Sequence, residues 1–162
     1  MLQGQVALVT GGGSGIGRAT ALAFSQEGIK VVVADISIQG GEQTVEMIKQ
    51  AGGEAFFIKT DVSKADEVET LVRKSVETYS QLDYAFNNAG IEGEQATTAD
   101  YPVSEWKRLI SINLTSVVLS PLQALSSPTS KRLRLSTLSQ LFHLTMFHPR
   151  PTIQGMENRG RN

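Results

Sequence analysis

Cysteine is absent from the 162-residue sequence, which excludes disulfide bonds, thiolate catalysis and cysteine-based metal sites. Long hydrophobic runs are absent too. None approaches the roughly 20 residues that span a membrane, and residues 1–4 lack the basic and apolar regions of a signal peptide. The net charge of −1 gives no reason to expect nucleic acid or an anionic membrane as a partner. We therefore expect a cytoplasmic protein with no metal, nucleic-acid or membrane partner, and its length predicts one globular domain.

Acidic residues are scarce near the end of the chain. Residues 1–120 contain 9 Lys and Arg against 15 Asp and Glu, whereas residues 121–162 contain 6 Lys and Arg against one acid, Glu157. The same last part holds both histidines and four of the five prolines. We therefore predict a folded domain over residues 1–120 and a basic, irregular tail rich in Ser, Thr, Pro and Leu over residues 121–162. A basic amphipathic helix and a disordered segment are the two alternatives for this tail.

Glycine is abundant, and five glycines fall within the seven residues 11–17. The apolar run 6–9 before them is typical of a buried parallel strand. A helix is predicted from near Gly15 until Gly28 ends it, and a second apolar strand over 30–34 is closed by Asp35. A flexible turn would also be rich in glycine. The strand before it, the helix after it and the acid at the next strand end favour a binding site instead.

This strand–turn–helix–strand unit is suited to binding a dinucleotide. Glycines let the backbone approach a pyrophosphate, and the helix that follows offers free N–H groups and a partial positive charge. Asp35, 18 residues after Gly17, can accept hydrogen bonds from a ribose diol and would repel a 2′-phosphate. Neither Ser14 nor Ile36 supplies the cation that a 2′-phosphate would need. The sequence therefore predicts an NAD site rather than an NADP site.

Strand and helix patterns alternate four times along the chain. Further strands are predicted over 54–59 and 82–87, with helices near 38–51 and after Ser63, which resembles a capping box with Asp66. Short links between such elements require a parallel sheet with helices on both faces, in the strand order 3-2-1-4. Asp61 and the stretch 87–90 then lie at the same carboxyl edge of the sheet as the glycine turn.

Four ordered motifs resemble the short-chain dehydrogenase/reductase family over about residues 3–120. They are T-G-x-x-x-G-I-G from Thr10, Asp35, Asp61-Val62 and Asn87-Asn88-Ala89-Gly90. The resemblance implies an α/β, Rossmann-type doubly wound parallel sheet and NAD-dependent hydride transfer between a hydroxyl and a carbonyl of a small alcohol or carbonyl substrate. It implies these cofactor-binding residues: Gly11, Ser14, Gly15, Ile16, Gly17, Asp35, Ile36, Asp61, Val62, Asn87, Ala89 and Gly90.

Two of these assignments have a purely structural alternative that involves no cofactor. Asp61 is also suited simply to begin a helix, and the Asn-rich stretch 87–90 is also typical of a turn.

A last helix is predicted to begin with Ser104 as its cap and to bury a stripe containing Trp106 and Ile110. Asn113 lies on that stripe. The resemblance makes Asn113 a catalytic residue that helps to hold a water in a proton relay, and a purely structural asparagine is the alternative.

The family's Tyr-x-x-x-Lys motif is missing from the sequence. Its three tyrosines are followed at i+4 by other residues: Tyr79 by Asp83, Tyr84 by Asn88 and Tyr101 by Glu105. We therefore expect a sheet truncated after about four strands, in a family oxidoreductase whose present form turns over no substrate. A non-catalytic NAD-binding module, or a dimerisation partner of a full-length relative, is the main alternative, with a homo-oligomer left open. A non-functional translation product is the third.

Overall fold

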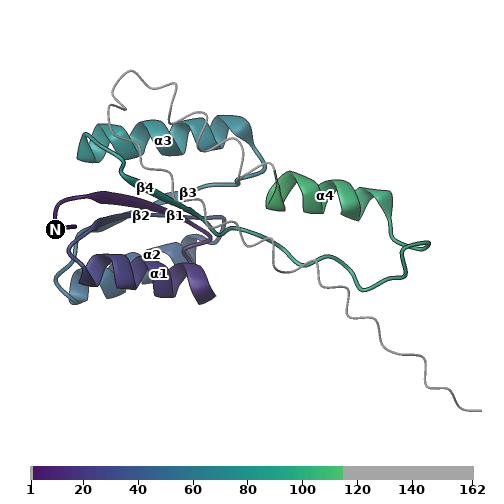
Figure 1. The fold of residues 1–162 in the computed structure, drawn as a ribbon, viewed down its shortest axis with the longest axis horizontal. Helices are drawn as coiled ribbons and strands as arrows, with labels where there is room; N and C mark the ends of the chain where they lie inside the picture. Colours follow the sequence, from purple (N-terminus) through teal and green to yellow (C-terminus); the bar gives the residue numbers. More distant parts are fainter. Residues whose placement is uncertain (1, 115–162) are drawn as a thin grey trace, which may run out of the picture.

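The computed structural model describes residues 2–114, which form a four-stranded parallel sheet with helices on both faces (Figure 1). The strand order is β3-β2-β1-β4, so the predicted order is confirmed. The predicted tail, residues 121–162, lies outside the described residues. The elements in chain order are β1 Val6–Thr10, α1 Gly15–Gln26, β2 Lys30–Asp35, α2 Ile38–Gln50, β3 Ala55–Lys59, α3 Ala65–Tyr79, β4 Tyr84–Asn87 and α4 Val103–Asn113.

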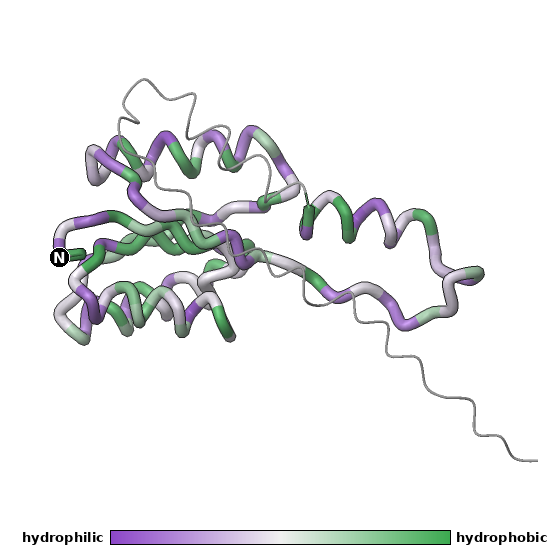
Figure 2. Tube along the Cα trace, viewed as in Figure 1, coloured by the Kyte–Doolittle hydropathy of each residue, from purple (hydrophilic) through white to green (hydrophobic). Residues whose placement is uncertain are grey.

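Two hydrophobic clusters hold the layers together. Helices α1 and α2 cover one face of the sheet and α3 covers the other (Figure 1). Because successive side chains of a strand point to opposite faces, Val9 and Val31 pack in the α1–α2 layer, whereas Val32 packs with Leu71 of α3. Figure 2 shows the hydrophobic residues gathered along the strands between these helices. The apolar runs predicted as buried parallel strands are therefore confirmed for β1 and β2, whose Val6–Val9 and Val31–Ala34 are all buried.

The register of the sheet brings the strand ends together. Thr10, the last residue of β1, pairs with Ala34 on β2 and with Asn87 on β4. Asp35 pairs with Lys59 at the end of β3. The loops that follow these strands therefore leave from a common carboxyl edge, where a doubly wound sheet binds its ligand.

The start of α3 differs from the prediction. The residue before the helix is Lys64, and no side chain caps it, so the expected capping box of Ser63 and Asp66 is wrong. The Ser63 hydroxyl instead donates to Asp61, two residues earlier. Serine and aspartate compete for local backbone and side-chain partners in this way, and the turn has taken the hydroxyl.

Helix α4 stands apart from the sheet (Figure 1), and none of its residues is buried. Trp106 is 50% exposed and Leu114 48% exposed, so the predicted buried stripe is wrong among the described residues. The residue preceding the helix is Pro102 rather than the predicted Ser104 cap. The apolar periodicity is present, but no sheet surface lies beneath it in the described part. Within residues 2–114, no helix combines the length and the apolar character that crossing a membrane would require.

Candidate functional site

The glycine turn at the end of β1 is held in one conformation. Its Gly12 N–H donates to the carbonyl of Ala34 on β2 at 3.1 Å. Gly17, in the first turn of α1, packs so closely on the turn that an added Cβ would lie 2.1 Å from the carbonyl oxygen of Gly11. A side chain at position 17 would therefore push the helix away from the turn. This close approach is what a dinucleotide site requires.

Asp35 lies directly at the mouth of this turn. Its Oδ2 accepts a hydrogen bond from Gly13 N at 2.8 Å, and its Oδ1 accepts one from Ser37 N at 2.8 Å. A Cβ added at Gly13 would lie 2.8 Å from Oδ2, so only glycine allows this approach. The backbone of two loops thus orients the carboxylate at the carboxyl edge of the sheet.

The Asn-rich stretch after β4 is fastened to the other side of the turn. Thr10 Oγ1 accepts from Asn88 N at 3.0 Å and from Ala89 N at 3.1 Å. The side-chain amide of Asn88 donates in turn to the carbonyls of Thr10 and Gly11 at 3.2 and 3.3 Å. These bonds bring Asn88 and Ala89 beside the glycine turn, across 77 to 79 positions of sequence. Asn87 ends β4, and residues 88–90 continue as irregular chain along the same edge.

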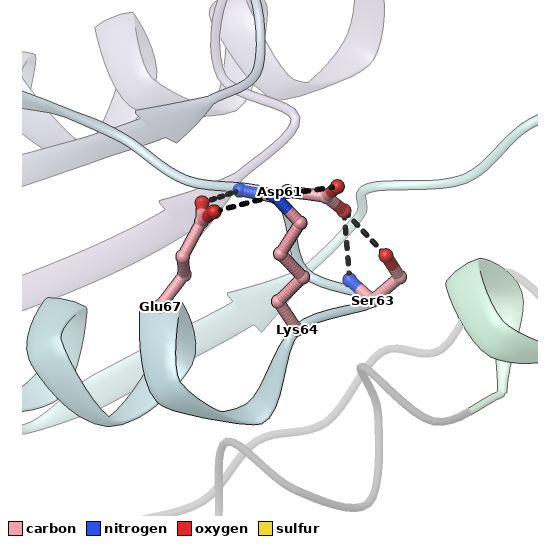
Figure 3. A network of polar contacts seen from close by, with 4 residues as sticks. All are labelled: Asp61, Ser63, Lys64 and Glu67. Atoms are coloured by element: carbon pink, nitrogen blue, oxygen red, sulfur yellow. Dashed lines mark hydrogen bonds and ion pairs between the residues drawn. The ribbon is translucent and has the colours of Figure 1, made fainter.

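Asp61 belongs to a polar network at the start of α3 (Figure 3). Its Oδ1 accepts from the amide and the hydroxyl of Ser63 at 3.0 and 2.6 Å, while Glu67 Oε2 accepts from Asp61 N at 2.7 Å. Lys64 Nζ lies 2.8 Å from Glu67 Oε1 and 3.8 Å from Asp61 Oδ2. The network fixes the direction of the Asp61 carboxylate beside the buried Val62.

The same contacts keep both acids of this network ionised. The hydrogen bond from the Ser63 hydroxyl lowers the pKa of Asp61, against the effect of burial, which would raise it. The hydrogen bond from Lys64 lowers the pKa of Glu67, and the bond to Glu67 raises the pKa of Lys64. Asp61 is therefore an oriented, charged acceptor over the ordinary range of pH.

Asn113 is tied to the loop after β4 through both ends of its side chain. Its Oδ1 accepts from Ile91 N at 2.9 Å and its Nδ2 donates to Ile91 O at 2.9 Å. The side chain is exposed rather than buried. These bonds hold the end of α4 against the loop that follows Gly90, which is a structural use of the asparagine. A proton-relay role for Asn113 stays a prediction.

The remaining candidates lie on the surface around the turn. The side chain of Ser14 makes no capping hydrogen bond at the start of α1, and Gly15 is exposed beside it. Ile16 is 57% exposed and Ile36 65% exposed. Exposed isoleucines that follow the glycine turn and Asp35 in the sequence suit contacts with an apolar ring or ribose face.

Among the residues of this edge that sequence reasoning missed, Arg18 is the charged one. It lines an open cleft of about 350 Å³ together with Asp35 and several polar residues. Its position carried a signal, since a cation in the first turn of a helix is opposed by the helix dipole. The full lining is Gly13, Ser14, Arg18, Asp35, Ser37, Gln39, Gly40 and Gln43.

Known proteins share both this sequence pattern and this fold. The family model described as short chain dehydrogenase matches residues 5–130, which is ten residues beyond the boundary suggested by composition. An uncharacterized oxidoreductase of Thermotoga maritima is 44% identical over 115 residues, covering 71% of this chain and 44% of the relative. The chain thus spans less than half the length of that relative.

Solved structures agree with this assignment. The crystal structure of levodione reductase superposes with a TM-score of 0.75 at 37% identity, covering 77% of this chain and 49% of that one. A short chain dehydrogenase/reductase from Burkholderia phymatum, in complex with NAD, gives a TM-score of 0.73 at 31% identity, over 75% of this chain and 43% of that one. With four ordered motifs meeting at one sheet edge and a family match over most of its length, the chain belongs to the short chain dehydrogenase family.

Proposed function

We propose that this chain binds NAD at the carboxyl edge of its sheet, as the cofactor unit of a short-chain oxidoreductase. The observation that carries the proposal is the 2.8 Å hydrogen bond between Gly13 N and Asp35 Oδ2. This bond holds the Asp35 carboxylate at the mouth of the glycine turn, and the proposal assigns the ribose to Asp35 and the pyrophosphate to the turn. The relative from Burkholderia phymatum, whose structure is a complex with NAD, supports the choice of a nicotinamide cofactor.

Each candidate residue has a distinct task in this proposal. The amides at the start of α1 bind the pyrophosphate, because their N–H groups lack partners within the helix. The carboxylate of Asp35 accepts from the ribose hydroxyls, and Asp61 with Val62 holds the adenine ring. Ala89 and Gly90 line the cofactor on the β4 side. The bound NAD would supply the hydride chemistry, while the protein supplies binding and orientation.

We further propose that residues 1–162 alone turn over no alcohol or carbonyl substrate. Removing a hydroxyl proton as the hydride leaves requires a positioned base, which the family provides with Tyr-x-x-x-Lys. None of Tyr79, Tyr84 and Tyr101 is followed by lysine at i+4. Asn113 cannot replace that base, because a side-chain amide does not titrate and its two ends already bind Ile91.

Calorimetric titration with NAD tests the binding proposal. We expect saturable binding by the native chain and a loss of about 10- to 100-fold in affinity for Asp35→Ala, the effect of removing hydrogen bonds to a charged group worth about 1.5–3 kcal/mol. Glu77→Ala is the matched control, since Glu77 is exposed and pairs with Arg73 on α3, the helix on the face of the sheet opposite α1 and α2. Equal affinities for native protein and Asp35→Ala would contradict the site. NADH formation on a panel of alcohols would contradict the absence of turnover.

A second function, as a partner subunit, is favoured by α4. Val103, Trp106, Ile110 and Leu114 lie on successive turns and are all exposed in the described part, at 67, 50, 36 and 48%. We propose that a second copy of the chain covers this stripe, because single exposed apolar residues are ordinary but a continuous stripe marks an interface. Sedimentation velocity distinguishes the cases. If the chain sediments as a monomer and still binds NAD, the partner-subunit function is contradicted and the NAD-binding function stands.

A further inference from the structure

Thr44 is a polar residue of α2 that is completely buried against the glycine turn. Its single hydroxyl proton is shared between two carbonyls, that of Gly12 at 2.9 Å and that of Gly40, one helical turn earlier, at 3.0 Å. The same oxygen accepts a hydrogen bond from Arg18 Nε at 3.0 Å. The hydroxyl therefore joins three segments inside the protein, namely the glycine turn, α1 and α2.

Ser75 of α3 shows how a buried hydroxyl in a helix is ordinarily satisfied. It is also completely buried, and its Oγ donates to the carbonyl of Leu71, four residues earlier, at 2.7 Å. This local bond meets the hydrogen-bonding need of a serine or threonine inside a helix. Thr44 has the equivalent local acceptor in Gly40, so its own burial does not account for the bond to Gly12, 32 positions away. That longer-range bond acts on the turn.

Three consecutive carbonyls of the glycine turn are each bound by a side chain from another part of the chain. The bonds are Asn88 Nδ2 to Gly11 O at 3.3 Å, Thr44 Oγ1 to Gly12 O at 2.9 Å and Arg18 Nη2 to Gly13 O. Every peptide bond in the described part is trans. The N–H of a trans peptide points opposite to its C=O. Each of the three side chains therefore also fixes the direction of the next amide along the turn.

The amides of the turn are directed accordingly. Gly12 N donates to Ala34 O at 3.1 Å and Gly13 N donates to Asp35 Oδ2 at 2.8 Å, so both are used within the protein. The Ser14 N–H has no acceptor within residues 2–114. It points away from α2, because the Gly13 carbonyl of the same peptide bond faces that helix. Ser14 thus offers the first amide of the turn that is available to a ligand.

We propose that Thr44 is a positioning residue for the cofactor, which orients the glycine turn for the pyrophosphate through the Gly12 carbonyl and through Arg18. This inference rests on the proposed NAD site. Because Thr44 is completely buried, it acts on the ligand only through the turn. A backbone already held in its binding conformation loses less freedom when the ligand arrives. The hydroxyl therefore contributes to affinity without contacting the cofactor.

The test removes the hydroxyl and keeps the shape of the side chain. We expect Thr44→Val to weaken NAD binding about three- to tenfold in calorimetric titration, the usual effect of losing one neutral hydrogen bond. Thr44→Ser retains the hydroxyl and should restore the native affinity. Amide hydrogen exchange followed by NMR should be faster in Thr44→Val at Gly12 and Gly13. These rates are compared with that of Leu8 in the central strand β1, whose amide reports opening of the whole domain.

Ser75→Ala is the matched control, because it removes an equally buried hydroxyl from the helix on the opposite face of the sheet. It should lower the stability of the fold. It should leave NAD affinity unchanged, together with the exchange of Gly12 and Gly13 relative to Leu8. Circular dichroism identifies any variant that fails to fold. Thr44→Ala, which removes the hydroxyl without adding a methyl group beside the Gly12 carbonyl, takes the place of Thr44→Val if that variant fails.

Hydrogen exchange separates this inference from the NAD site itself. If the native chain does not bind NAD but Thr44→Val speeds the exchange of Gly12 and Gly13, the proposed function fails and the control of the turn by Thr44 stands. Three results overturn the inference. The first is exchange at the turn that is as slow in folded Thr44→Val as in the native chain. The second is equal NAD affinity for Thr44→Val and a native chain that binds NAD. The third is an equal loss of affinity in Ser75→Ala.

Discussion

At the scale of single residues, the carboxyl edge of this sheet is organised by acids whose direction is fixed by backbone amides. Asp35 accepts from Gly13 and Ser37, and Asp61 accepts from Ser63. A carboxylate already oriented by the protein loses little freedom when a ligand binds. For Asp61 the bond from the Ser63 hydroxyl also favours the charged form, because it lowers the pKa of this carboxyl. The stability of the fold is therefore linked to the protonation of Asp61.

The effect of Asp61 on stability should depend on pH, and this dependence can be measured. Because the Ser63 hydroxyl lowers the pKa of Asp61 below its ordinary value of 3.8, ionised Asp61 stabilises the fold above pH 3.8, and that contribution is lost as the pH falls through the lowered pKa. We expect Asp61→Asn to be less stable than the native chain at pH 7, with the difference shrinking as the pH falls below 3.8 and through the lowered pKa. Urea denaturation at a series of pH values measures it. A difference that does not depend on pH would contradict the prediction.

At the scale of elements, α3 and α4 share the same spacing of apolar residues but differ in whether these residues are buried. Both helices carry apolar residues at intervals of three and four. In α3 the stripe packs on the sheet, where Leu71 is fully buried, whereas in α4 the stripe is exposed. The first helix holds the fold together, and the second presents a surface.

A pair of substitutions tests this difference. Leu71→Ala should lower the free energy of unfolding by about 2–5 kcal/mol, because it leaves a cavity beneath the sheet. Trp106→Ala removes a larger side chain but should change the monomer's stability by no more than about 0.5 kcal/mol, as for other exposed positions. Urea denaturation at low protein concentration measures both. A loss of several kcal/mol for Trp106→Ala would mean that residues outside the described range bury α4.

At the scale of the whole molecule, the candidate cofactor residues are confined to the first part of the chain. They extend from Gly11 to Gly90, within one sheet edge and the loops that leave it. The family match continues to residue 130, and the compositionally distinct tail occupies 121–162. None of the candidate cofactor residues lies in the tail.

A shortened chain tests this separation. Residues 1–130, which end with the family match, should bind NAD with an affinity within about twofold of that of the full chain. A twofold change corresponds to a difference of only roughly 0.4 kcal/mol in binding free energy. Calorimetric titration of both chains, each checked for native circular dichroism, makes the comparison. A folded shortened chain that binds NAD tenfold more weakly would show that the tail reaches the site.

The alternation of strands and helices, the 3-2-1-4 order and the position of Asp35 could all be predicted from the sequence. The signals are local. Apolar runs mark β1 and β2, glycines allow the turn between Thr10 and Gly17, and short links permit only a right-handed parallel arrangement. Asp35 follows from the end of β2, because a residue that closes a parallel strand has to lie at the ligand edge.

Two features were decided by tertiary structure alone. Arg18 is held at the cleft by acceptors 22 to 26 positions away on α2, which its place in the first turn of α1 does not indicate. The bond from Ser63 to Asp61 is different, because it is local and the sequence allowed either this partner or the start of the helix. The apolar residues of α4 are spaced as in a buried helix, yet their exposure depends on whether another segment packs against them. Periodicity specifies which face of an element is apolar, and only the packing of distant segments specifies whether that face is covered.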